Sequence, residues 1–333
     1  MSKREFFART LEKTGLGTLL SSTVCRWNGL LVFNYHRIGD PAHSPFDRAL
    51  YSAGVEEFEQ QVRFLRKNSD VVGIGDLDQV FRQPHRAVLI TFDDGYRDNY
   101  DLAFPVLKQE NVPATFFVTS GFIDDRPISW WDEIAWMVRN CLHHELPDPT
   151  VEGEFLPLAT PEDQETAIQK ILRYYKDLPL AQTAPFLDEL ADTTGSGRCP
   201  TSLAQDVWMD WDMIREMDQA GMDIGGHTVT HPVLARASTE QQHQEIFDSK
   251  QRIETELGHS ISAFSYPVGQ PTSFTEVTKA ILKDAGYQWA FSFSGGFSRI
   301  DHTDAFDLPR VAVSPFLSLN LFQATARFPA VFA

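Results

Sequence analysis

Asp93 and Asp94 are adjacent carboxylates that follow an apolar run at residues 87–90 and precede Gly95. An apolar run that ends near a glycine is typical of a buried strand followed by a sharp turn. Placing a carboxylate there costs free energy unless a metal, a cation or a hydrogen-bond network stabilises it. The pair therefore predicts a functional site, although Asp-Asp-Gly alone would also suit a turn with an Asx-type hydrogen bond.

A second cluster far along the chain holds His227 and His231, four residues apart. If this segment forms one helical turn, both imidazoles face the same way, which is a common arrangement for holding a transition metal. Histidines at this spacing also occur on solvated helix faces. Gly225 and Gly226 before the pair and Pro232 after it indicate a special backbone rather than an exposed helix.

One carboxylate and two imidazoles would make a three-ligand metal site. Open positions for water and substrate are typical of catalytic rather than structural zinc. Because neighbouring residues near a strand end point in different directions, one aspartate of the pair could bind the metal while the other acts as a base. These residue types therefore predict metal-assisted hydrolysis.

Three segments carry a resemblance to a known family. Residues 91–96, Thr-Phe-Asp-Asp-Gly-Tyr, resemble the first motif of the polysaccharide deacetylases, also called NodB-homology carbohydrate esterases. Residues 226–232 are similar to the second motif of that family, His-Thr/Ser-x-x-His-Pro. Residues 264–269 resemble the third motif, without the arginine that is usual near its start. In family order the resemblance spans residues 29–320.

The resemblance implies a distorted (β/α) barrel with fewer than eight strands. It also implies metal-dependent removal of acetyl groups from an N-acetylated sugar, with one divalent transition metal, for which Zn²⁺ is the expected ion. By position in the motifs, Asp93 takes the role of catalytic base. The metal-ligand roles fall on Asp94, His227 and His231.

The general acid has to come from another part of the chain, because the usual C-terminal Leu-x-His motif is not found. Residues 31–38 are instead similar to the N-terminal Tyr-His segment of a circularly permuted branch that includes the poly-N-acetylglucosamine deacetylases. In that branch the acid histidine comes from the first strand. The resemblance therefore implies that His36 is the acid that protonates the departing amine.

Further candidates for substrate contact lie near expected strand ends. By resemblance Tyr266 and Pro267 line the substrate groove. The same two residues would also suit a purely structural role, with the proline in a turn and the tyrosine packed in the core. A backbone N–H after Gly95, that of Tyr96, is expected to stabilise an oxyanion. Arg310 needs a carboxylate partner if it faces inward, and we expect it to orient Asp93; a surface role is equally open.

The expected elements alternate between strands and helices, which is the pattern of a parallel α/β fold. Such barrels place their chemistry at the carboxyl ends of the strands. We expect strands at residues 30–34, 71–74, 87–92, 114–119, 261–266, 288–293 and 308–313. We expect helices at residues 55–67, 105–111, 162–175, 185–192, 210–220, 239–257 and 276–285. The expected division is an N-terminal helical extension (1–28), the barrel (29–320) and a C-terminal tail (321–333).

The alternation is interrupted at residues 130–206, which we expect to be a helical insertion within the barrel. The insertion could form a wall of the substrate site or a solvent-side addition, and the sequence does not decide between them. Trp130 and Trp131 at its start could stack on a sugar ring. Paired tryptophans at a helix start also serve as core packing.

Composition limits the class of partner. The chain has 333 residues with a formal net charge of −17, which argues against binding to nucleic acid or anionic lipid and favours a neutral or cationic substrate. Three scattered cysteines argue against a disulfide framework. The first residues lack the apolar stretch of a signal peptide, so residence in the cytoplasm is the expectation. Contact of residues 1–28 with a membrane surface stays open.

Other functions remain compatible with these residues. The same site could hydrolyse an O-acetyl ester or a non-sugar amide. A catalytically degenerate carbohydrate-binding protein would bind metal without turnover. A structural subunit of a polysaccharide-synthesis complex would make no demand on the aspartates and histidines.

Overall fold

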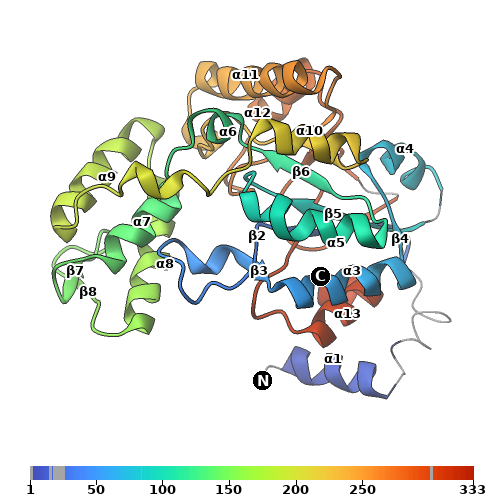
Figure 1. Cartoon of the computed structure of the whole chain (residues 1–333), viewed down its shortest axis with the longest axis horizontal. Helices are drawn as coiled ribbons and strands as arrows, with labels where there is room; N and C mark the ends of the chain where they lie inside the picture. Colours follow the sequence, from blue (N-terminus) through green and yellow to red (C-terminus); the bar gives the residue numbers. More distant parts are fainter. Residues whose placement is uncertain (1–2, 15–16, 18–26, 84, 301–302) are drawn as a thin grey trace.

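A curled sheet forms the centre of the protein, with helices packed around it (Figure 1). The computed structural model describes residues 3–14, 17, 27–83, 85–300 and 303–333. Within these residues the sheet has nine strands. They are β1 (Gly29–Tyr35), β4 (Asp70–Val71), β5 (Arg86–Phe92), β6 (Thr115–Val118), β9 (Asp223–Gly226), β10 (Ala263–Ser265), β11 (Trp289–Phe291), β12 (Ser298–Arg299) and β13 (Val311–Ala312).

The order β11-β10-β9-β6-β5-β1 is parallel throughout, and β13 continues it beside the end of β1. β4 pairs with the start of β5, on the same side on which β6 pairs with its end. In the same way, β12 pairs with the start of β1, on the side on which β13 pairs with its end. Seven parallel strands therefore follow one another around the barrel. A bridge between Phe291 and Leu308 joins the segment ahead of β13 to β11. The predicted class, a distorted barrel with fewer than eight strands, is confirmed.

On one face of the two central strands, β1 and β5, apolar side chains come first and a polar side chain comes last. Leu30, Val32 and Asn34 lie on one face of β1, and Leu89 and Thr91 lie on the matching face of β5. The apolar members form a small buried cluster inside the barrel. The polar members come last in each strand and are paired in register, so they meet at the carboxyl ends.

Helices cover the outer face, where the other side chains of the strands form the larger core. They are α3 (Val55–Asn68), α5 (Phe104–Glu110), α6 (Ser120–Asp125), α10 (Trp211–Gln219), α11 (Thr239–Leu257), α12 (Glu276–Asp284) and α13 (Leu319–Arg327). The short helix α4 (Leu77–Val80) instead packs its buried residues against the cluster inside the barrel. Shorter elements are β2 (Arg37–Ile38), β3 (Tyr51–Ala53), a π turn (Asn99–Ala103) and 3-10 turns (Arg48–Leu50, Ile74–Asp76, Thr201–Ala204, Leu234–Arg236). The strand predicted at residues 71–74 is shorter than expected, because Ile74 begins a 3-10 turn.

Residues 130–206 form the helical insertion, which stands at one side of the barrel (Figure 1). Its elements are α7 (Trp130–Arg139), β7 (Glu145–Pro147), β8 (Phe155–Pro157), α8 (Pro161–Asp177) and α9 (Leu180–Thr194). The prediction that a helix begins at Pro185 was wrong. Pro185 lies inside α9, which begins five residues earlier at Leu180.

The two ends of the described chain pack together. α1 (Lys3–Lys13) lies against α13, and α14 (Pro329–Phe332) completes a small apolar cluster there. The expected boundary at residue 320 falls inside α13, so residues 321–333 consist mostly of the rest of α13 and of α14 rather than an extended tail. Residues 18–26 of the expected extension, with Cys25, lie outside the described residues. Among those that are described, no helix is both long and apolar enough to cross a membrane.

Candidate metal centre and active site

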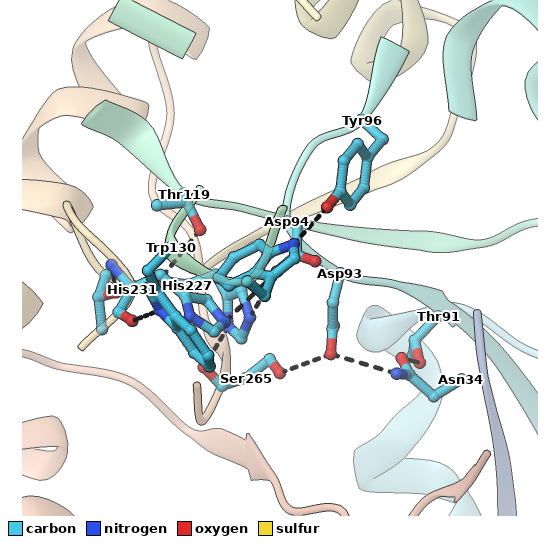
Figure 2. A network of polar contacts seen from close by, with 12 residues as sticks. Asn34, Thr91, Asp93, Asp94, Tyr96, Thr119, Trp130, His227, His231 and Ser265 are labelled. Carbon is cyan, nitrogen blue, oxygen red and sulfur yellow. Dashed lines mark hydrogen bonds and ion pairs between the residues drawn. The ribbon is translucent and has the colours of Figure 1, made fainter. Parts of the chain in front are cut away.

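Asp94, His227 and His231 converge at the carboxyl ends of β5 and β9 (Figure 2). Oδ1 of Asp94 lies 3.4 Å from Nε2 of His227 and 3.4 Å from Nε2 of His231. All three residues are buried. Donor atoms that share a tetrahedral ion with bonds of about 2.1 Å lie about 3.4 Å apart. The spacing therefore fits three ligands of one metal ion.

The hydrogen bonds around these groups also fit a metal. Nδ1 of His227 lies 2.7 Å from the carbonyl oxygen of Ser265, to which it can donate its proton, so that Nε2 keeps a lone pair for an ion. Burial lowers the pKa of His231 to about 3, which keeps that imidazole neutral. Oδ1 of Asp94 is buried and has no hydrogen-bond partner among the described residues. A buried carboxylate oxygen needs a cation or a donor, and an ion between the three residues would supply it.

The backbone of this region is irregular. The segment that carries the two histidines is not a helical turn, as one of our sequence interpretations assumed: Thr228 has φ 67° and His231 has φ 58°. Asp94, with φ 79°, and Val268, with φ 63°, also lie in the left-handed region. Residues other than glycine adopt this conformation at a cost in free energy, and such strain gathers at functional sites. The histidines converge because of this unusual backbone.

Two contacts hold the histidine segment in place. The side chain of Glu245 in α11 accepts hydrogen bonds of 2.8 Å from the backbone N–H groups of Val229 and Thr230. Gly226 allows the close approach of Tyr287, since a Cβ there would lie 2.2 Å from the Tyr287 hydroxyl. Sequence reasoning missed Glu245, which is one of many charged residues on a long amphipathic helix.

Asp93 faces a different set of partners from its neighbour. Figure 2 shows it turned toward Asn34 and Ser265. The guanidinium of Arg310 binds its carboxylate with two hydrogen bonds of 2.8 Å each. The other donors of Arg310 go to Asn34 Oδ1, Ser265 Oγ and the Ser292 carbonyl. All five N–H groups of a buried arginine are therefore satisfied, and the expected ion pair with Asp93 is present.

Arg310 controls the charge of Asp93. Burial on its own would raise the pKa of Asp93, but the positive charge of Arg310 and its hydrogen bonds hold that pKa well below its usual range. Asn34, Thr91 and Ser265 complete the polar layer around this ion pair. Sequence reasoning missed these three residues. A polar residue that closes an apolar strand, as Asn34 does, was the signal available.

A pocket of about 490 Å³ opens above these groups. It is lined by Asp93, Asp94, both histidines of the metal group and His36. Burial lowers the pKa of His36 and outweighs the charges of Asp94 and Asp93, which act to raise it. The backbone of His36 is fixed by hydrogen bonds to Ser52 and Asn99. The imidazole that we expected to act as acid therefore shares one pocket with the expected base and metal ligands.

The remaining candidates divide into two groups. Trp130, Trp131 and Tyr266 line the pocket. Tyr96 and Pro267 are not among the described residues that line the pocket, and the contacts with substrate expected of the Tyr96 backbone N–H and of Pro267 stay predictions. The ring of Tyr96 is buried against Trp208, and its hydroxyl accepts a hydrogen bond from Trp131. Pro267 is buried in a tight turn.

A sequence model described as polysaccharide deacetylase matches residues 82–290, which is more than half of the chain. The chain belongs to the polysaccharide deacetylase family. This deacetylase is 25% identical over 274 residues to the putative polysaccharide deacetylase YxkH of Bacillus subtilis, covering 81% of this chain and 68% of that protein. It is 28% identical over 126 residues to the poly-beta-1,6-N-acetyl-D-glucosamine N-deacetylase of Escherichia coli K12, and that match covers 35% of this chain and 18% of the relative.

Solved structures share the fold of this deacetylase. Streptococcus pyogenes deacetylase PplD, solved in complex with acetate, superimposes with a TM-score of 0.59 at 18% identity, over 89% of this chain and 97% of that one. IcaB from Ammonifex degensii gives a TM-score of 0.56 at 21% identity, over 90% and 97% of the two chains. At these identities the likeness concerns the fold alone.

Removing the carboxylate of Asp94 is expected to abolish metal binding at this group of residues. Zn²⁺ at a hundred times its dissociation constant should stabilise the metal-free wild type by about 2.7 kcal/mol, because the ion binds the folded state. Asp94→Asn should show no such rise in Tm. The matched control is Asp78→Asn, at an exposed aspartate, which should respond like the wild type. Equal stabilisation of both variants would place the ion elsewhere.

Proposed function

We propose that this protein is a metal-dependent hydrolase that removes acetyl groups from an N-acetylated sugar polymer. The observation that carries the proposal is the convergence of Asp94, His227 and His231 beside an ionised Asp93 in one pocket. A three-ligand metal group with a separate base beside it is an arrangement that can hydrolyse an amide. Membership of the polysaccharide deacetylase family supports the same reaction.

In this proposal Asp94, His227 and His231 hold the ion, for which Zn²⁺ fits the nitrogen and oxygen ligand set. When bound, such an ion supplies a Lewis acid and lowers the pKa of water at the site. Asp93 accepts the proton of the attacking water through its carboxylate. Arg310 keeps that carboxylate ionised and fixes its direction.

Two more groups complete the proton and charge movements. The backbone N–H of Tyr96 donates a hydrogen bond to the oxyanion that forms as water attacks the acetyl carbonyl. His36 then protonates the departing amine, because an amine leaves poorly without a proton. Its place in the pocket with Asp93 and Asp94 supports this role.

The substrate class follows from the relatives and from the pocket. Curated relatives from Escherichia coli and Staphylococcus bear the name poly-beta-1,6-N-acetyl-D-glucosamine N-deacetylase. The pocket offers the rings of Trp130, Trp131 and Tyr266, which suit the apolar face of a pyranose. We therefore propose an N-acetylglucosamine-containing polymer or its precursor. Residence in the cytoplasm stays a prediction from the sequence.

Acetate release tests the function directly. Metal-loaded protein should release acetate from N-acetylated oligosaccharides faster than from free N-acetylglucosamine or a nucleotide-linked sugar, because a longer chain fills more of the pocket. Release should cease after chelation and return when Zn²⁺ is added. Preferential release from an O-acetylated oligosaccharide would indicate an esterase instead. Tight metal binding without release from any substrate would favour a degenerate carbohydrate-binding protein.

A further inference from the structure

Helix α8 of the insertion forms one wall of the active-site pocket. Gln169, Leu172, Arg173 and Lys176 all line it. Their spacing of three and four residues places them on one face of the helix. The insertion therefore contributes directly to the space in which the polymer would lie.

Helix α8 is fixed in this position by contacts on its other sides. The ring of Tyr175 stacks on Trp130, with centroids 4.5 Å apart. Glu165 forms an ion pair with Arg139 of α7, with an N–O distance of 2.7 Å. The orientation of the helix, and with it the direction of the pocket-facing residues, is thus set by packing against α7.

The basic side chains of α8 differ in their partners according to whether they face the pocket. Lys170, which does not line the pocket, pairs with Asp148. Within the described residues, Arg173 and Lys176 form no hydrogen bond or ion pair, and the Lys176 ammonium lies 5.9 Å from the centre of the Trp130 ring. Two like charges three residues apart repel one another. The exposed Arg173 and the half-buried Lys176 therefore give this wall of the pocket a positive charge.

The chain has many carboxylates that could have balanced these cations, with 46 acidic against 29 basic residues. Asp47 is the carboxylate that lines the same pocket near Lys176. Its Oδ1 already accepts the backbone N–H of Ala49, and among the described residues it forms no ion pair with either cation, although its charge acts on Lys176. One buried aspartate without an ion pair to either cation leaves two positive side chains on this wall against one carboxylate.

We propose that Arg173 and Lys176 bind an anionic group, a phosphate or a carboxylate, that the sugar polymer carries next to the acetylated residue. This inference rests on the proposed function and names its substrate more closely. A guanidinium can bind either group with two parallel hydrogen bonds, and an ammonium adds a mobile point charge. Gln169 can donate a further hydrogen bond. The net charge of −17 favours a neutral or cationic partner, but the charge inside the pocket determines which substituent is bound there.

Three sets of oligosaccharides of equal length test the proposal. One is neutral N-acetylglucosamine, one alternates N-acetylglucosamine with glucuronic acid, and one carries a phosphate on the neighbouring sugar. The wild type should show a higher kcat/KM on at least one anionic set. Arg173→Gln combined with Lys176→Gln should lower the anionic-to-neutral ratio of kcat/KM at least about tenfold, since each charged hydrogen bond is strong. Lys170→Gln, the control on the same helix, should keep the ratio.

The possible results separate this inference from the proposed function. An unchanged ratio in the double variant, or an equal fall in Lys170→Gln, would overturn the anionic subsite while acetate release upheld the deacetylase. If no oligosaccharide releases acetate, the proposed function fails, and binding still decides the subsite. Calorimetry with the full-length protein should then show tighter binding of an anionic set, weakened by the double variant and by added salt. Equal affinity for neutral and anionic sets would overturn it.

Discussion

Asp93→Asn is expected to lower kcat about 10²–10⁴-fold while the protein keeps its metal. The carboxylate of Asp93 is directed at Arg310 and Ser265 rather than at the histidines, so its loss leaves the group of Asp94, His227 and His231 intact. An asparagine amide cannot accept the proton of the attacking water. The fall should appear in kcat and kcat/KM alike, because the group acts in the transition state. Acetate release under saturating substrate measures it.

Metal analysis of the same preparations provides the control. Asp93→Asn should contain as much metal as the wild type, whereas Asp94→Asn should contain little. This contrast separates the two neighbouring carboxylates, which differ by one position in the sequence and by all of their partners in the structure. A fully active Asp93→Asn would reject its assignment as base. Loss of metal from that variant would mean that both aspartates are ligands.

Much of the barrel could be predicted because its strands are continuous apolar runs. The strand at residues 87–92 and the helix at 239–257 have the expected bounds to within one residue. The helix ends at Gly258, with φ 77°, the conformation that glycine adopts most readily. Local residue preferences decide such elements, so a single sequence is enough to place them. The position of the aspartates at a strand end followed from the same pattern.

The polar layer beneath the pocket could not be predicted, because it depends on strand register. Asn34 pairs with Thr91 across β1 and β5, and Ser265 joins them from β10. Each residue is unremarkable in its own segment. The two-residue strand β13 was equally hard to delimit, since it is held by its neighbour β1 rather than by its own composition. Tertiary contacts, which no local pattern encodes, bring these residues together.

The orientation of the insertion could not be predicted from the sequence, because it too depends on tertiary contacts. The apolar spacing of α8 predicted a helix but not which element would cover its buried face. Packing against α7 turns Arg173 and Lys176 into the pocket. The sequence left open whether Trp131 would face the substrate site or the core, and the structure places it at the boundary of both: it lines the pocket and donates a hydrogen bond to Tyr96.

Arg310→Gln is expected to destabilise the protein by about 3–5 kcal/mol, because it leaves a buried carboxylate without its cation. Arg310 is 1% exposed and Asp93 3% exposed, so water cannot replace the lost bonds. The acceptors on Asn34 and Ser265 lose a donor as well. Urea unfolding followed by circular dichroism should show the midpoint falling with little change in slope. Arg82→Gln, at an exposed arginine, should stay within about 0.5 kcal/mol of the wild type.

The double variant Asp93→Asn with Arg310→Gln separates the ion pair from packing. If the destabilisation comes from an unpaired buried charge, removing that charge should restore part of the stability. The double variant should then lose less than the sum of the two single losses, with an interaction free energy of about 1–3 kcal/mol. Strict additivity would mean that the two side chains stabilise the barrel independently. Arg310 would then be a packing residue at the carboxyl ends of the strands, and the charge of Asp93 would need another source.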